Sequence, residues 1–173
     1  MNLIFRLIWM LIAARFGAKR GVMEESSLTY RCWPWDLDMN MHMTNSRYYS
    51  FMDLSRIDFA IRTGAWVRLR AQGFYPVLGS STVRFRRPVA PFQKFRVTTR
   101  IVSWDDRWIY FSHNIIIGNN EPATLGIMKG IFINKNGRIP MEQLMSIMGY
   151  TAPRPDFTAA LQKKDELDAL LKA

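Results

Sequence analysis

The stretch DLDMNMHMTNSRYYSFMDLSR, residues 36–56, joins a cluster of polar side chains to the first turns of an apolar helix. We expect this helix over residues 45–62, because apolar side chains cover most of its circumference and Thr63-Gly64 supplies a stop signal. A helix that is apolar almost all round has to be buried. Two acids, two amides and a histidine therefore stand at the mouth of the most buried helix of a 173-residue protein.

After the helix, apolar and polar side chains alternate with a period of two, and this pattern predicts a sheet. A strand-like run at 28–35 precedes the helix, and four further strands follow it. The positions expected to face the core are Val83, Phe85, Phe95, Val97, Thr99, Ile101, Ile109, Phe111, Ile115, Leu125, Ile127, Ile131 and Ile133. This order favours an α+β fold, in which one curled antiparallel sheet covers the helix. One sheet cannot enclose a helix completely, so we expect a homodimer or a higher homo-oligomer.

The two ends of the chain predict helical additions. Residues 1–20 form an apolar helix in this reading, but its apolar part, residues 3–14, is shorter than the roughly 20 residues that span a bilayer. Two alternatives remain open: contact with a membrane surface, or packing on its own domain or on a partner subunit. Residues 28–135 would form the main domain, and residues 136–173 a C-terminal helical extension with helices near 140–149 and 157–173.

Charge and composition limit the partners. The chain has 24 Lys and Arg against 14 Asp and Glu, a net charge of +10, which attracts an anionic partner such as nucleic acid, lipid head groups or a phosphorylated small molecule. No stacking motif or recognition module supports nucleic acid. The single Cys32 excludes an internal disulfide, and we expect it to be buried in a cytoplasmic protein, with contact at the inner membrane left open. Two scattered histidines and one cysteine predict no metal site, and no cofactor is expected.

The residues DLDMNMHMTNSRY (36–48) resemble the motif of hotdog thioesterases. In that motif a strand-end Asp is followed four residues later by His, and then by Asn and an aromatic residue at the helix start. The plant acyl-carrier-protein thioesterases have a close version, and VRFRRPV (83–89) is similar to their following strand. The resemblance covers about residues 28–135. It implies a hotdog fold, a curved antiparallel sheet wrapped around a long central helix, and hydrolysis of acyl-CoA or acyl-carrier-protein thioesters.

The resemblance also implies roles for single residues. Asp38 matches the general base or nucleophile, Asn40 and His42 match its polar partners, and Asn45 opens the central helix. The free amides near Thr44 and Asn45 would stabilise the oxyanion. Two positions depart from the family pattern: Met41 stands where a glycine often precedes the histidine, and Arg84 or Pro88 stands where the plant enzymes have a second acid.

Several other polar residues have more than one interpretation. Basic side chains on the polar faces of adjacent strands are expected to bind the phosphates of coenzyme A or an acidic carrier protein, although a solvated sheet face explains them equally well: Arg84, Arg86, Arg96 and Arg100. Asp58 is expected to pair with Arg62, and His113 to be structural. A non-catalytic acyl-binding or lipid-binding protein at a membrane surface is the alternative function.

Overall fold

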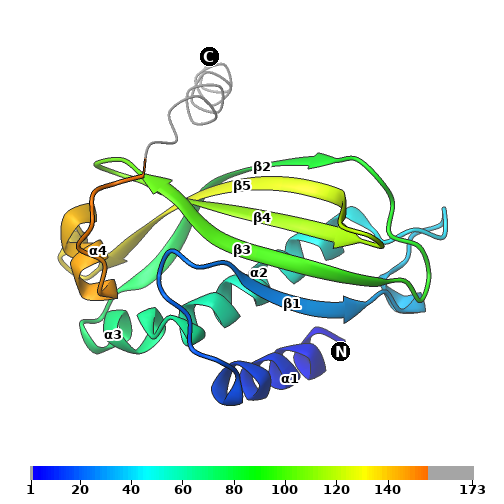
Figure 1. The fold of residues 1–173 in the computed structure, drawn as a ribbon, viewed down its shortest axis with the longest axis horizontal. Helices are drawn as coiled ribbons and strands as arrows, with labels where there is room; N and C mark the ends of the chain where they lie inside the picture. Colours follow the sequence, from blue (N-terminus) through cyan, green and yellow to red (C-terminus); the bar gives the residue numbers. More distant parts are fainter. Residues whose placement is uncertain (1, 156–173) are drawn as a thin grey trace.

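One curled antiparallel sheet wraps around a long helix in the computed structural model, which describes residues 2–155 (Figure 1). The elements in chain order are α1 (Asn2–Phe16), β1 (Ser26–Arg31), a 3-10 turn (Pro34–Asp36), α2 (Asn45–Arg62), α3 (Ala65–Ala71), β2 (Tyr75–Phe85), β3 (Lys94–Trp104), β4 (Ile109–Ile117), β5 (Glu121–Asn134), β6 (Gly137–Arg138) and α4 (Met141–Met148). The strand order is β1-β3-β4-β5-β2, and the short β6 pairs with β5. This arrangement confirms the predicted α+β hotdog fold.

Helix α2 has the predicted bounds and lies against the concave face of the sheet. Phe51 and Met52 are completely buried, and the ring of Phe51 lies 4.8 Å from that of Phe95 on β3. Polar contacts also join the helix to the sheet. The Thr99 hydroxyl on β3 donates to Ser55 at 2.8 Å. The predicted pair of Asp58 and Arg62 is confirmed at 2.7 Å. These contacts fix the helix relative to the strands that surround it.

The core face of β5 differs from the prediction. Leu125, Ile127, Ile131 and Ile133 were expected in the core, but they lie on the convex face of the sheet. The register places Gly126 opposite His113 and Met128 opposite Phe111, so the residues that face α2 are Thr124, Gly126, Met128 and Gly130. A Cβ added at Gly126 would lie 2.9 Å from the His113 carbonyl oxygen on β4 and 3.5 Å from the methyl carbon of Met52 on α2. Glycine is needed at this position because the backbone of the neighbouring strand leaves no room for a side chain.

Strands β2 and β3 follow each other in sequence but are not neighbours in the sheet. Strands β4 and β5 lie between them, and the connection at residues 86–93 carries the chain from one edge of the sheet to the side of β1 (Figure 1). Strand β3 then pairs with β1, with Leu28 opposite Val97. The expectation that the arginines of these two strands project from adjacent strands is therefore wrong.

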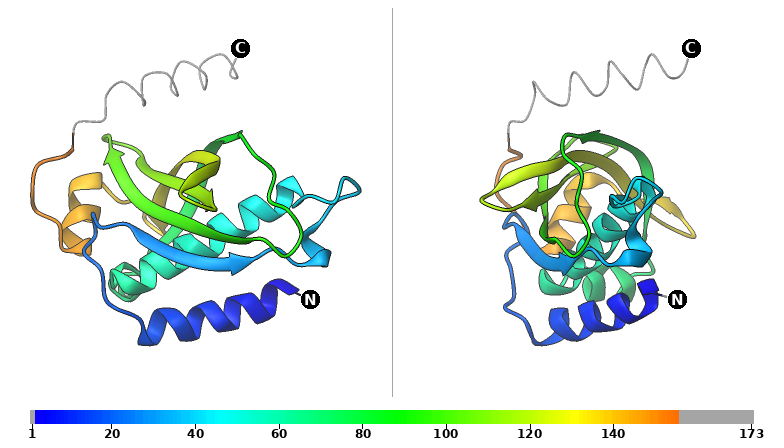
Figure 2. Two further views of the ribbon diagram at one scale, coloured as in Figure 1. Left: turned by 45° about the vertical axis from the view of Figure 1, so that its right-hand side comes forward. Right: turned by 90° about the vertical axis from the view of Figure 1, so that its right-hand side faces the viewer.

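Helix α1 packs against the body of the protein with one face. Met10 and Ala14 are buried, and Leu3 and Leu7 pack against the main core. Figure 2 shows α1 on the outside of the molecule, running alongside α2. Within residues 2–155 the structure contains no helix with the length and hydropathy needed to cross a bilayer. Helix α4 confirms the short helix predicted near 140–149, whereas the helix predicted at 157–173 lies outside the described residues.

Candidate functional site

The polar cluster forms a tight loop between the 3-10 turn and α2. Leu37 and Met43 form an isolated antiparallel bridge at its base. The Asp38 amide donates to the His42 carbonyl at 2.8 Å, and the Met41 amide donates to the Asp38 carbonyl at 3.1 Å. Asp38 and His42 are exposed in the single chain, as is Asn40. The structure thus brings these three predicted site residues together on one loop, and it leaves their side chains open to solvent.

The Asp38 carboxylate organises this loop. Its Oδ1 atom accepts hydrogen bonds from the backbone amides of Asn40 at 2.9 Å and His42 at 3.3 Å. Within residues 2–155, Oδ2 has no hydrogen-bond partner. One oxygen therefore holds the loop, and the other is left to accept a proton from a water molecule or to attack a carbonyl carbon.

The backbone of the loop has a glycine-type conformation at the position where this chain departs from the family motif. Met41 has φ = 58°, in the left-handed region where glycine carries no Cβ penalty. The family often has glycine at this position, so the loop keeps a glycine-type conformation with a larger side chain. The Met41 side chain is exposed and Met39 is completely exposed. Both methionines therefore expose apolar surface on the loop that carries Asp38.

The N-terminus of α2 lies directly after the loop. Thr44 is the N-cap residue, but its side chain makes no capping hydrogen bond, and Asn45 is the first helical residue. The amide groups of a first helical turn have no partner within the helix and point toward its positive dipole end. Since no Thr44 side chain covers them, these amides can receive a developing oxyanion.

The end of strand β2 and the connection that follows it support the start of α2. The Met43 amide donates to the Val89 carbonyl at 3.0 Å, and the Val89 amide donates to the Tyr48 hydroxyl at 3.2 Å. The Tyr48 ring packs edge-on against Phe85 at 5.1 Å. The loop and the helix start are therefore fixed to the C-terminal end of β2.

Asp36 is a central residue of the site that the sequence analysis did not identify. Its carboxylate is completely buried and accepts hydrogen bonds from Arg6 of α1 at 2.6 and 2.8 Å. The Trp33 amide donates to the same carboxylate at 2.9 Å, and Arg47 lies 3.4 Å away. The Asp36 carbonyl accepts from the Thr44 amide at 2.8 Å. The signal for this contact was Arg6 itself, the one charged residue in the apolar run of residues 3–14, because a charge that is buried in apolar surroundings needs a partner.

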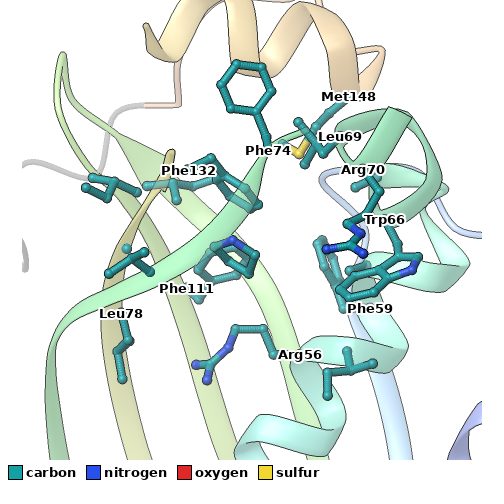
Figure 3. A pocket seen from close by; sticks show the side chains of 18 residues that line it. Arg56, Phe59, Trp66, Leu69, Arg70, Phe74, Leu78, Phe111, Phe132 and Met148 are labelled. Carbon is teal, nitrogen blue, oxygen red and sulfur yellow. The ribbon is translucent and has the colours of Figure 1, made fainter. Parts of the chain in front are cut away.

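An apolar pocket of about 210 Å³ lies at the other end of α2 (Figure 3). Figure 3 shows Phe59, Phe111 and Phe132 around the pocket, with the Trp66 and Arg70 side chains at one side. The pocket is also lined by the first residues of β2, including Leu78. A cavity of this size and lining suits an apolar group such as part of an acyl chain.

The four arginines predicted to bind phosphate lie in two separate places. Arg84 and Arg86 are exposed at the end of β2, which is an edge strand of the sheet. Arg96 and Arg100 are exposed on β3, and Arg96 donates to Asn120 at 2.8 Å. The first pair flanks Phe85 at the end of β2, and the second pair lies on β3, with strands β4 and β5 between the two pairs.

Two other reactive groups are buried in the core, and a third is held in an ion pair on the surface. His113 is buried, its Nδ1 atom lies 2.8 Å from the Thr99 hydroxyl, and burial together with nearby Arg56 lowers its pKa to about 3. This histidine is neutral near pH 7. Burial raises the pKa of the Cys32 thiol to about 11, so the cysteine is not a nucleophile at neutral pH. Asp53 forms an ion pair with Arg56 on the surface of α2.

Comparisons with known proteins give the following similarities. The sequence profile described as the thioesterase-like superfamily matches residues 32–164. Protein THEM6 of Drosophila melanogaster is 29% identical over 99% of this chain and 86% of its own length. The thioesterase lcsJ of Purpureocillium lilacinum is 28% identical over 79% of this chain, which spans only 52% of that protein. Among solved structures, the DHNA-CoA thioesterase of Staphylococcus aureus has a TM-score of 0.61 and 15% identity, over 86% of this chain and 93% of that one.

Proposed function

Because the chain belongs to the thioesterase-like superfamily, we propose that it hydrolyses acyl thioesters of coenzyme A or of an acyl carrier protein to a free acid and a thiol. The DHNA-CoA thioesterase with the same fold supports a coenzyme A substrate. The observation that carries the proposal is a carboxylate with one uncommitted oxygen, Asp38, immediately before a helix start whose amides are not capped by a side chain. A location in the cytoplasm remains a prediction.

In the proposed reaction, Asp38 removes a proton from water or attacks the thioester carbonyl directly. The Asn45 and Ser46 amides of the first turn of α2 stabilise the negative charge that forms on the carbonyl oxygen, because the Thr44 amide already donates to the Asp36 carbonyl. Asn40 and His42, on the same loop, would orient the water and the substrate. The thiolate leaves and takes up a proton from the solvent. If Asp38 attacks directly, the acyl–Asp38 anhydride that remains is hydrolysed by water, which releases the free acid and restores the carboxylate.

The exposure of Asp38 in a single chain supports a site completed by a second copy. Strand β2 is at the edge of the sheet, and within residues 2–155 no other strand pairs with its outer side. Unpaired edges are templates for pairing with another strand. If two β2 strands pair antiparallel about a twofold axis, the start of one lies beside the end of the other. The start of β2 borders the apolar pocket, and its end supports the Asp38 loop.

This geometry places the Asp38 loop of one protomer at the apolar pocket of the other. The thioester carbon would lie near Asp38 and the helix start, and the acyl group would extend into the partner subunit. A homodimer would then contain two such composite sites, and no single chain would contain a complete one.

Mixing two inactive variants tests both parts of the proposal. Asp38→Asn should lower kcat for acyl-CoA by about 100-fold or more, with the fold and the oligomeric state unchanged. Ala60→Trp should fill the pocket in an otherwise intact chain, since Ala60 lines it. Subunits of the two variants, unfolded and refolded together, should recover roughly a quarter of the wild-type activity, because half of the dimers are mixed and each has one intact site.

Full turnover by Asp38→Asn would refute the role of this carboxylate. A dimeric mixture that is no more active than its parents would refute the composite site. Saturable binding of acyl-CoA without thiol release by the unmutated protein would instead indicate a non-catalytic acyl-binding protein, an alternative that the missing second acid at Arg84 or Pro88 keeps open.

A further inference from the structure

The outer face of α1 is a continuous apolar surface. The inner face is occupied by the contact with α2, whereas six apolar residues on the other side are between 42% and 84% exposed: Ile4, Phe5, Ile8, Leu11, Ile12 and Phe16. Figure 2 shows this side of α1 uncovered by any other described element. Single exposed apolar residues are ordinary, but a contiguous patch on one helix indicates a partner.

An aromatic groove extends this surface toward β1. Trp9 of α1 lies in it together with Trp33 and Trp35, whose rings stack at 5.6 Å. Phe92 packs edge-on against Trp33 at 6.0 Å and is also exposed. Tryptophan is enriched where protein meets the head-group region of a bilayer, because its ring is apolar and its N–H is polar.

Basic residues stand at the end of the same helix. Arg15, Lys19 and Arg20 are exposed, against the two exposed acids Glu24 and Glu25, and Arg20 lies 4.0 Å from Glu24. The net charge of the whole chain is +10. Lys and Arg beside an anionic membrane each contribute roughly 1 kcal/mol of attraction. A second copy of this chain would bring an equal positive charge to the face, so charge favours an anionic bilayer over self-association.

Helix α1 has a fixed orientation on the protein. The buried ion pair between Arg6 and Asp36 holds the helix against the body, and Arg6 also stacks over the Phe51 ring at 4.6 Å. The helix has 15 residues and is about 22 Å long. It is too short to cross a hydrocarbon core of about 30 Å, and its outer face can only lie flat on a surface.

We propose that the outer face of α1 and the Trp33–Trp35 groove together dock the protein on a bilayer that contains anionic lipids. Given the proposed thioesterase function, docking also defines the substrate class. Asp36 joins α1 to the catalytic loop, and the exposed Met39 and Met41 add apolar surface on the loop that carries Asp38. The substrates are then long-chain acyl thioesters, whose acyl chains partition into the membrane on which the enzyme sits.

Vesicle flotation with the full chain tests the docking without any need for activity. The protein should float with vesicles of phosphatidylcholine mixed with phosphatidylglycerol, and less with phosphatidylcholine alone, and high salt should weaken the binding. The double substitution Ile8→Glu and Ile12→Glu should weaken binding to the anionic vesicles at least about tenfold. Val67→Glu is the matched control, because Val67 is a 70% exposed apolar residue on another helix.

Further variants separate this proposal from the proposed reaction. Asp38→Asn should float as the wild-type protein does, even with hydrolysis abolished. The α1 double variant should keep its hydrolysis of a short, soluble acyl-CoA and lose rate only with a long-chain acyl-CoA presented in vesicles. Equal flotation of the α1 variant and the wild type overturns the proposal. So does a wild type that stays free of both vesicles while the α1 variant changes its oligomeric state, since the face is then covered by a second copy.

Discussion

Replacement of Arg6 by alanine tests whether α1 supports the catalytic loop. The Asp36 carboxylate is completely buried, and Arg6 supplies its two shortest hydrogen bonds, at 2.6 and 2.8 Å. Removing one member of a buried ion pair typically costs about 3–5 kcal/mol, because the other charge stays buried without its partner. The Trp33 amide at 2.9 Å and Arg47 at 3.4 Å keep part of the stabilisation. We therefore expect the free energy of unfolding to fall by about 3 kcal/mol.

Urea denaturation measures this loss, and thermal unfolding should show a decrease in Tm of about 10 °C. Arg15→Ala, at an exposed position of the same helix, is the matched control and should change the stability by less than about 0.5 kcal/mol. The double variant Arg6→Met with Asp36→Asn should be more stable than Arg6→Ala, because it leaves no buried charge. A stability for Arg6→Ala equal to that of Arg15→Ala would refute the role of α1 as a support of the loop.

The other predictions concern the arginines, the buried histidine and the start of α2. In steady-state assays, the double variant Arg84→Ala/Arg86→Ala, at the end of β2, should raise KM for acyl-CoA about tenfold, and the double variant Arg96→Ala/Arg100→Ala, on β3, should leave KM unchanged. His113 has a pKa lowered to about 3, so below its ordinary value of 6.5 the unfolded chain binds a proton that the folded chain does not. As the pH is lowered from 6.5 to about 3, the free energy of unfolding should therefore fall by up to about 1.4 kcal/mol per pH unit. His113→Gln should flatten this slope in urea titrations at several pH values. Tyr48→Phe leaves the buried Val89 amide without its acceptor, and a loss of about 1–3 kcal/mol in unfolding free energy should result; an unchanged value would exclude that hydrogen bond.

The sequence was sufficient for the central helix and for most of the strands. The bounds of α2 follow from its apolar circumference and from Thr63-Gly64, and both signals are local. The alternation at Phe95, Val97 and Ile101 also predicts the correct core face, because these residues pack directly on α2. Local patterns are reliable where one side of an element alone is buried.

The pattern failed where both faces of a strand carry apolar residues. In β5 the larger side chains, such as Leu125 and Ile127, face outward, and the inner positions include Gly126, where a Cβ would lie 2.9 Å from the His113 carbonyl oxygen of β4. The order of the strands was equally hidden, since nothing in residues 86–93 indicates that the chain crosses to β1. The predicted site loop was found through its motif. The contact of Arg6 with Asp36, which supports the loop, was not predicted, because these two residues are 30 positions apart in the sequence.

The strand order also bears on how the protein acquires its structure during synthesis. Strands β3, β4 and β5 are joined by short turns and can pair early, but β1 waits for β3, where Ser26 lies opposite Thr99. Contacts this distant in sequence slow folding. Helices α1 and α2 leave the ribosome when β1 is the only strand of the sheet that has been made, so most of the apolar surface of α2 stays uncovered until β3, β4 and β5 are complete. We expect the newly made chain to depend on chaperones, and to aggregate when it is released before β5 is complete.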